Sequence, residues 1–252
     1  MPEIAEVRTV AKTLNERIVG EKIIGIDIYY DGIIQDNIDY FIENVVNRTI
    51  TRVHNYGKYF IKRLGHDLLK HEHIIFNFLS DLDLRYHDTR KFGTMRVVNT
   101  SDIYDCSEIK KLGIEPDSDK LTKEYIYNSV CKSKKPIKTL LLDQTIINGL
   151  GNIYVDEVLH ASKLNPETLG CNITLEDSDN IRINSKEIIE KATLGGGTTI
   201  RSYTSSLNVY GTYQEHLKVH TKDICGTCGE KIQKIRVGGR GTYFCPKCQI
   251  KK

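Results

Sequence analysis

A chain of 252 residues is long enough to bury a sizeable hydrophobic core, and this length favours two domains over one. The residues are 39% hydrophobic and 27% charged, and no apolar run approaches the length that spans a membrane, so we expect no membrane partner. The formal net charge is only +3, which permits a nucleic-acid partner without requiring one, because local clusters of charge decide that question.

The chain opens with MPEIAEV, which lacks the basic and apolar regions of a secretory signal. Glu3 and Glu6 stand three residues apart, on one face of a helix if a helix begins here. One interpretation is a helix start, with Pro2 just inside it and acids favoured by the macrodipole. The other is that removal of Met1 leaves Pro2 as a free secondary amine beside two carboxylates. These seven residues do not decide between the two.

The periodicity of the chain changes twice. Apolar residues at positions 4, 7, 10, 14 and 18 predict an amphipathic helix. From residue 22 to about residue 100, short β-branched and aromatic segments predict strands of an antiparallel sandwich or barrel. These segments are KIIGIDIYY, RTITRVHNY, KYFIKRL, HIIFNFL, LDLRYHD and TMRVVN. After the linker GIEPDSDK, helices are predicted over roughly 121–132, 138–148, 152–163 and 184–194. This order predicts an α+β protein of two lobes.

The segment CGTCGEKIQKIRVGGRGTYFCPKC holds four of the seven cysteines. Two C-x2-C pairs with sixteen residues between them suit a tetrahedral four-thiolate site, which predicts one structural Zn²⁺. The ligands would be Cys225, Cys228, Cys245 and Cys248. The alternative is two disulfides, which is disfavoured because an odd cysteine total without a signal peptide indicates a reducing compartment.

The residues between the two cysteine pairs are basic. Lys231, Lys234, Arg236 and Arg240 occur there, and no acid stands between Glu230 and Cys245. A basic hairpin on a rigid metal base suggests a contact with phosphate. Zinc ribbons that act only as scaffolds are an alternative of equal weight.

The segment IKTLLLDQTIINGLGNIYVDEVLHASKL predicts two helices separated by a glycine turn. Gly149 and Gly151 break the first helix, and Asn152 is placed to cap the second. The backbone N–H groups at the start of the second helix form an anion site that fits a DNA phosphate. Two core helices joined by a glycine turn explain the same pattern about as well.

Seven motifs together resemble the formamidopyrimidine-DNA glycosylase family, in the family's order and over nearly the whole chain. They are PEIAEV, YGKYF, DTRKFGTM, LLLDQTIINGLGNIYVDEVL, GGTTIRSY, YGTYQEHL and GGRGTYFCPKCQ. The motifs near the C-terminus favour the oxidised-purine branch over the endonuclease VIII-like branch. The resemblance implies a catalytic domain of an N-terminal helix and β-sandwich over 1–115. A helical domain with a helix–two-turn–helix over 121–215 and a zinc finger over 216–252 would follow it.

The resemblance also implies a bifunctional DNA glycosylase and abasic-site lyase. Pro2 would attack C1′ of the damaged nucleotide, which suits a secondary α-amine that is partly neutral at physiological pH. Glu3 would be the general acid for the sugar ring oxygen, and Glu6 would organise the site. Lys58, from a hairpin, would contact the substrate as the fourth catalytic residue. The residues that would bind DNA are Asn152 and Arg240 at phosphates, and Arg90 and Phe92 in the gap left by a flipped base. The implied partner is double-stranded DNA with damaged bases or abasic sites, bound by a monomer in a bacterial-type cytoplasm and nucleoid.

Three features depart from the family pattern. Ala5 and Arg8 stand where the family generally has proline and an acid. Only 31 residues separate Lys58 from Arg90, so the loop that usually inserts a methionine into the vacated base position is expected to be missing. A damage- or abasic-site-binding protein with little base excision is therefore the alternative hypothesis. A zinc-ribbon transcription factor is disfavoured, since it would not need Pro2, Glu3 and Glu6.

Overall fold

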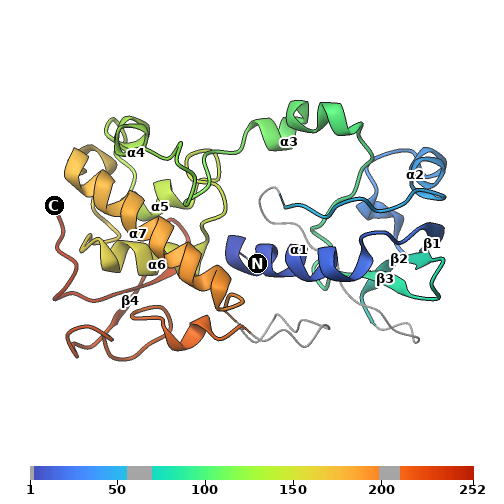
Figure 1. Cartoon of the computed structure of the whole chain (residues 1–252). Coiled ribbons are helices and arrows are strands. Elements are labelled where there is room, and N and C mark those ends of the chain that lie inside the picture. The colour runs from blue at the N-terminus through green and yellow to red at the C-terminus, as the bar shows by residue number, and fades with distance from the viewer. Residues whose placement is uncertain (1–2, 56–69, 199–210) are drawn as a thin grey trace. The chain divides into compact units, whose positions relative to one another are not determined.

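The computed structural model describes residues 3–55, 70–198 and 211–252 (Figure 1). The chain divides into two compact units. The sheet unit comprises Val7–Lys110 and Arg201–Tyr210. The helical unit comprises Met1–Glu6, Lys111–Ile200 and Gly211–Lys252. The first residues of the chain therefore belong to the same unit as its C-terminal half.

Helix α1 (Ile4–Ile18) begins in the helical unit and continues into the sheet unit. Ile4 is buried in the core of the helical unit, whereas Val10, Leu14 and Ile18 are buried in the core of the sheet unit. The spacing of three and four residues places these side chains on one stripe of the helix. The amphipathic helix predicted from the sequence is confirmed.

The sheet unit contains an antiparallel sheet in the order β1-β2-β3. Its strands are β1 (Ile23–Ile28), β2 (Glu72–Phe78) and β3 (Asp83–His87). Strand β2 pairs on both edges and is buried along most of its length. Its alternate residues Ile74, Phe76 and Phe78 pack in the same core as α1, and burial of each such side chain contributes about 1.5–3 kcal/mol. The α+β fold class predicted from the sequence is confirmed.

Two of the strands predicted from the sequence do not form among the described residues. Segments 48–55 and 94–99 pair only through single bridges, Lys22 to Thr49 and Ile34 to Met95. The first segment leaves the ladder because the side chain of Asn15 both donates to and accepts from the backbone of Val53. The predicted strand KYFIKRL lies outside the described residues.

Helix α2 (Ile38–Val45) lies in a region for which only strands were predicted. Asn37 begins it, since its side chain accepts the backbone N–H of Tyr40 at 3.1 Å. Phe41, which is buried, lies on the face of α2 that packs on the core. The helical spacing of the apolar residues was present in the sequence, but the surrounding β-branched segments masked it.

The remaining helices lie between residues 100 and 215. They are η2 (Thr100–Asp105), α3 (Ser107–Lys110), α4 (Lys123–Val130), α5 (Ile137–Leu141), α6 (Asn152–Ala161), η3 (Gly170–Asn172), α7 (Leu175–Leu194) and η4 (Tyr213–Glu215). A short helix η1 (Asp31–Ile33) precedes α2.

Two of these helices differ from their predicted bounds. Helix α5 ends before the predicted residue 148, because Asp143 bonds to Thr145 and starts a turn. Helix α7 begins before the predicted 184, because Thr174 and Asp177 form a capping box.

The C-terminal segment forms a two-stranded antiparallel ribbon of β4 (Gln233–Val237) and β5 (Arg240–Phe244). Gly238 and Gly239 connect the strands with φ angles of 55° and 78°. Two consecutive positive φ angles suit a tight hairpin turn and favour glycine at both positions. Arg240 is exposed directly after this turn.

Candidate active site

Glu3 is held against the first turn of helix α6. Its carboxylate oxygens accept backbone N–H groups from Gly151 at 2.9 Å, Ile153 at 3.0 Å and Tyr154 at 3.2 Å. An α-helix leaves such N–H groups unpaired at its N-terminus, where its dipole also favours negative charge. Glu3 is only 4% exposed. Helix α6 therefore fixes a buried carboxylate on the residue that follows Pro2.

Glu6 joins the same region from the first turn of α1. One carboxylate oxygen accepts the backbone N–H of Glu3 at 2.9 Å. The other accepts the hydroxyl of Tyr154 at 2.6 Å and the backbone N–H of Thr198 at 2.7 Å. Burial, together with the negative charge of Glu6, raises the pKa of Tyr154, so this hydroxyl remains a donor. Glu6 thus connects the backbone at Glu3 to α6 and to Thr198, four residues after the end of α7.

The glycine turn before α6 makes room for these contacts. Gly149 has a φ of +93°, and a Cβ there would lie 2.7 Å from the side chain of Ile4. A Cβ on Gly151 would lie 2.2 Å from the carboxyl carbon of Glu3. Gln144 holds the turn, because its amide accepts the N–H of Gly149 and donates to the carbonyl of Leu150. A side chain at position 151 would displace Glu3.

This geometry corrects two sequence-based expectations. The N–H groups expected to bind a DNA phosphate instead bind the carboxylate of Glu3. Asn152 was expected to cap α6, but Gly151 occupies the cap position and Glu3 supplies the acceptor. The side chain of Asn152 donates to the carbonyl of Gly241 at 2.9 Å. Its Oδ1 is buried and has no hydrogen-bond partner among the described residues.

Acidic side chains of α6 hold the zinc-ribbon segment. Asp156 accepts the backbone N–H of Tyr243 at 3.1 Å and pairs with Nδ1 of His220 at 2.8 Å. Glu157 accepts three consecutive backbone N–H groups, those of residues 218–220, at 2.8–3.0 Å. Both acids are at least 96% buried. The start of α6 therefore binds Glu3, and the rest of the helix binds the ribbon.

Lys138 completes this network. Its ammonium donates to Asp156 at 2.6 Å and to the carbonyl of Gly241 at 3.2 Å, and the side chain is fully buried. Burial lowers the pKa of Lys138, and the charge of Asp156 opposes that effect. Roles for Lys138, Asp156 and Glu157 were not predicted from the sequence. The available signal was a set of charged residues inside otherwise apolar helical segments.

Four cysteine side chains converge beside the ribbon. The sulfur atoms of Cys225, Cys228, Cys245 and Cys248 lie within 4.8 Å of one another. Two of the sulfur pairs are 3.9 and 3.5 Å apart. Zn–S bonds of about 2.3 Å at tetrahedral angles require separations of roughly 3.8 Å. The four thiolates therefore fit Zn²⁺ and fill its coordination sphere, which leaves it a structural role.

His160 reaches this site from the last turn of α6, and its Nε2 lies 3.3 Å from the sulfur of Cys225.

Arg90 and Phe92 lie in the sheet unit on an exposed loop that Asp88 organises. The carboxylate of Asp88 accepts the backbone N–H groups of Arg90, Phe92 and Gly93, each at 2.9 Å. Burial acts to raise the pKa of Asp88, but these donors outweigh it and hold the pKa below its usual value.

The ring of Phe92 is 77% exposed, and the guanidinium carbon of Arg90 lies 5.5 Å from its centroid. An exposed ring beside a cation, on a constrained loop, is a combination that can insert between the bases of a nucleic acid. Pro2 and Lys58, the other two predicted site residues, lie outside the described residues.

Three segments of the chain match known families. Residues 1–95 match the formamidopyrimidine-DNA glycosylase N-terminal domain, and residues 112–204 match the formamidopyrimidine-DNA glycosylase H2TH domain. Residues 224–250 match the zinc finger found in FPG and IleRS. The chain belongs to the formamidopyrimidine-DNA glycosylase family. The family predicted from the sequence motifs is confirmed.

Relatives of this glycosylase align with it over nearly the whole of both chains. The formamidopyrimidine-DNA glycosylase of Lactobacillus johnsonii is 39% identical over 273 positions, which cover 99% of each chain. That of Ligilactobacillus salivarius is 40% identical over 275 positions and covers all of both chains. The present glycosylase has 252 residues, so these relatives carry residues that it lacks.

Solved structures of FPG from Lactococcus lactis have the same fold. A single-residue variant in complex with a Fapy-dG containing DNA is 36% identical, with a TM-score of 0.92. A complex with an abasic site containing DNA is also 36% identical, with a TM-score of 0.91. Both alignments cover 99% of the present glycosylase and all of the Lactococcus chain. The predicted two-lobed architecture with a helix–two-turn–helix and a zinc finger is confirmed.

These findings also confirm the predicted reaction class. The chain is a DNA-repair glycosylase with abasic-site lyase activity, and the damage-binding alternative is not favoured. One structural zinc belongs to the four cysteines of its finger. Among the helices of the described ranges, none is long and apolar enough to cross a membrane.

Proposed function

We propose that this glycosylase excises oxidised purines from duplex DNA, and cuts the strand at the abasic site, with Pro2 as its nucleophile. The DNA in the Lactococcus complexes, which contains Fapy-dG or an abasic site, supports this substrate class. The observation that carries the assignment is the clamp on Glu3. The residue bonded to Pro2 is fixed through its backbone N–H by Glu6 and through its carboxylate by α6. A nucleophile needs such a fixed neighbour to act with a positioned acid.

The chemistry follows from a secondary amine beside a carboxyl group. The nitrogen of Pro2 forms a bond to C1′ as the bond from C1′ to the damaged base breaks, and the departing base takes a proton from water. The Pro2 nitrogen passes its own proton to the carboxylate of Glu3. Glu3 gives that proton to the ring oxygen as the sugar opens, which leaves an iminium between Pro2 and C1′. This iminium is positively charged without taking up a proton. Loss of a proton from C2′ then expels the 3′ phosphate, a second elimination expels the 5′ phosphate, and water releases Pro2.

The remaining predicted residues would hold the DNA. Asn152 and Arg240 would contact phosphates near the flipped nucleotide, and Lys58 would contact the substrate. Arg90 and Phe92 would fill the gap in the base stack. The exposed position of Arg240 and the exposed ring of Phe92 support these assignments. Bacterial relatives support a cytoplasmic enzyme that associates with the nucleoid through DNA.

Borohydride trapping tests the nucleophile. The full-length, zinc-loaded protein should form a covalent complex with a duplex that contains an abasic site, because borohydride reduces the iminium. Proteolysis and mass spectrometry should place the adduct on Pro2. The Pro2→Gly variant should still bind this duplex but lose most of the trapped complex. An adduct on Lys58 or another lysine in the wild-type protein, or full trapping by Pro2→Gly, would show that the assignment is wrong.

A further inference from the structure

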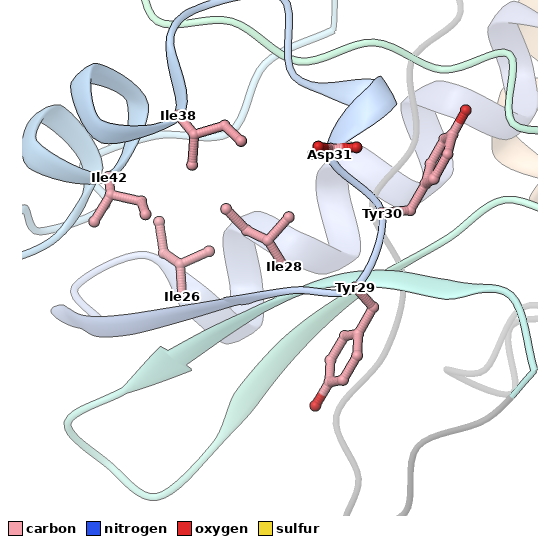
Figure 2. A pocket seen from close by; sticks show the side chains of 7 residues that line it. All are labelled: Ile26, Ile28, Tyr29, Tyr30, Asp31, Ile38 and Ile42. Carbon is pink, nitrogen blue, oxygen red and sulfur yellow. The ribbon is translucent and has the colours of Figure 1, made fainter.

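An apolar groove lies in the sheet unit between strand β1 and helix α2 (Figure 2). Ile26 and Ile28 project from the strand toward Ile38 and Ile42 of the helix. The space between them is about 560 Å³, within the usual range of ligand pockets. The turn of residues 29–31 closes one end. None of the residues that line this β1–α2 groove belongs to the proposed active site.

Ile26 packs against the core of the sheet unit, but the other isoleucines of the groove are not part of that core. Phe41 and Ile33 supply the core contacts of this region, and they are 3% and 0% exposed. Ile38 is 37% exposed, and Ile42 is half-buried. They stand four residues apart on the flank of α2, where they present one continuous apolar edge. The groove thus exposes branched aliphatic side chains that a folded chain usually covers.

The charged side chains of the segment that forms the groove are all negative. Residues 26–47 include five acids and no lysine or arginine, although the whole chain has a net charge of +3. Asp31 lines the groove, and Asp39 and Glu43 are exposed on α2 directly after Ile38 and Ile42. No salt bridge joins these three acids to any described residue. Their charge is therefore available to an outside partner.

This charge selects the kind of partner. Phosphates of DNA and of anionic lipid would be repelled, so neither suits the groove. Basic side chains flanking apolar ones would match both the rim and the walls. The groove also borders the loop that we place on DNA, because the ammonium of Lys91 lies 3.8 Å from the ring centroid of Tyr30. A segment docked in the groove would lie next to that loop without occupying it.

We propose that the β1–α2 groove docks a basic amphipathic helix of a partner protein. Apolar residues at helical spacing would lie between the isoleucines of β1 and those of α2, which is the usual way a helix binds an apolar groove. Lysine or arginine on either side would face Asp31, Asp39 and Glu43. The groove thereby gives this repair enzyme a protein-binding surface separate from its DNA-binding residues.

The test uses a fluorescein-labelled 14-residue peptide of leucines at helical spacing with lysine elsewhere, and a second peptide with glutamate in place of lysine. Anisotropy should show the lysine peptide binding to the full-length, zinc-loaded protein, and the glutamate peptide not binding. Asp39→Lys with Glu43→Lys should weaken binding at least tenfold, and Ile38→Asn should weaken it separately. The control is Ile183→Asn with Glu187→Lys on α7, which changes an exposed isoleucine and an exposed acid on a helix that does not line the groove.

Four results would overturn the proposal. They are no binding of the lysine peptide, equal binding of both peptides, full binding by the two α2 variants, and equal loss in the α7 control. Sedimentation of the protein alone adds a fifth. A dimer that Asp39→Lys with Glu43→Lys converts to a monomer would mean that a second copy of the chain occupies the groove. Cleavage of DNA with an abasic site should be unchanged in the α2 variants.

Discussion

Burying a carboxylate costs several kcal/mol unless hydrogen bonds replace its water. Glu3 and Glu6 solve this problem with different donors. Glu3 uses the free N–H groups of a helix start, which are rigid and lie close to the chain terminus. Glu6 uses a hydroxyl and the N–H groups of two separate segments. The first arrangement leaves a carboxyl group fixed for chemistry, and the second joins three segments.

Tyr154→Phe tests how much the hydrogen bond to Glu6 stabilises the fold. The change removes the hydroxyl that donates to Glu6 at 2.6 Å and keeps the buried ring. A hydrogen bond to a charged group contributes about 1.5–3 kcal/mol, so Tm should fall by about 3–12 °C. Differential scanning calorimetry of the zinc-loaded protein measures this.

Tyr213→Phe is the control for this prediction. Tyr213 packs in the same core, 6.1 Å from Tyr154 between ring centroids, and its hydroxyl has no hydrogen-bond partner in the described parts of the chain. Its Tm should stay within about 2 °C of the wild-type value, because no hydrogen bond is lost. Equal losses in the two variants would mean that the bond to Glu6 is not what stabilises the site.

The loop of Arg90 and Phe92 should depend on pH through Asp88. Three backbone N–H donors hold the pKa of this carboxyl below its usual value, despite the opposing effect of burial. A depressed pKa means that the ionised form stabilises the loop above about pH 3.9, the unfolded value, and that this is lost as pH falls through the folded pKa. The amide NMR shifts of Phe92 and Gly93 should therefore titrate with a midpoint below about 3.9. A midpoint at or above that value would mean that the three backbone N–H groups do not stabilise the ionised carboxylate of Asp88.

At the scale of elements, α6 connects the two ends of the chain. Its first turn binds Glu3, and its later turns bind residues 218–220 and the zinc ribbon. The existence of this helix and the glycine turn before it could be predicted, because both depend on local periodicity and turn residues. The contacts of its acids with residues 218–220 and with the ribbon could not, because those partners lie more than 60 positions away in the sequence. Only the fold brings them together.

The zinc ribbon should separate metal binding from DNA binding. Arg240 is exposed after the glycine turn, and none of the four sulfur ligands belongs to that turn. Arg240→Ala should therefore keep one zinc per chain, weaken DNA binding and lower the slope of log K against log salt by about 1. Metal analysis and binding titrations at several salt concentrations measure these effects.

Lys231→Ala serves as a comparison, since Lys231 is exposed in the same basic segment but lies before β4, away from the turn. It should also keep its zinc, with a smaller change in slope. Loss of zinc from Arg240→Ala, or a salt slope equal to that of the wild-type protein, would place the phosphate contact elsewhere.

At the scale of the whole molecule, the chain order predicted two lobes, but not which residues belong to each. Glu3 and Glu6 precede the strands, yet they bond to residues about 150 and 190 positions later. Periodicity shows which face of a helix is buried, and it does not show what covers that face. The sequence motifs supplied the grouping instead, since they place Pro2, Glu3 and Glu6 in one site.

The chain is also shorter than its relatives, and this should affect its two activities unequally. Alignments of 273 and 275 positions against 252 residues show that residues are missing, and we place the loss between Lys58 and Arg90. Flipping a base opens a gap in the stack at a cost of about a few kcal/mol, which inserted side chains offset. An abasic site has no base to extrude. Excision of 8-oxoguanine should therefore suffer more than cleavage at an abasic site.

Single-turnover rates on otherwise identical duplexes measure the difference. A loss of about 1.4 kcal/mol in transition-state stabilisation lowers a rate tenfold, so we expect 8-oxoguanine to be removed at least about ten times more slowly than an abasic site is cut. Inserting the corresponding longer segment of the Lactobacillus johnsonii relative between Lys58 and Arg90 should restore excision and change the abasic-site rate little, because only the first reaction must fill a new gap. Equal rates in the present chain, or no gain from the insertion, would mean that Arg90 and Phe92 fill the gap without the missing residues.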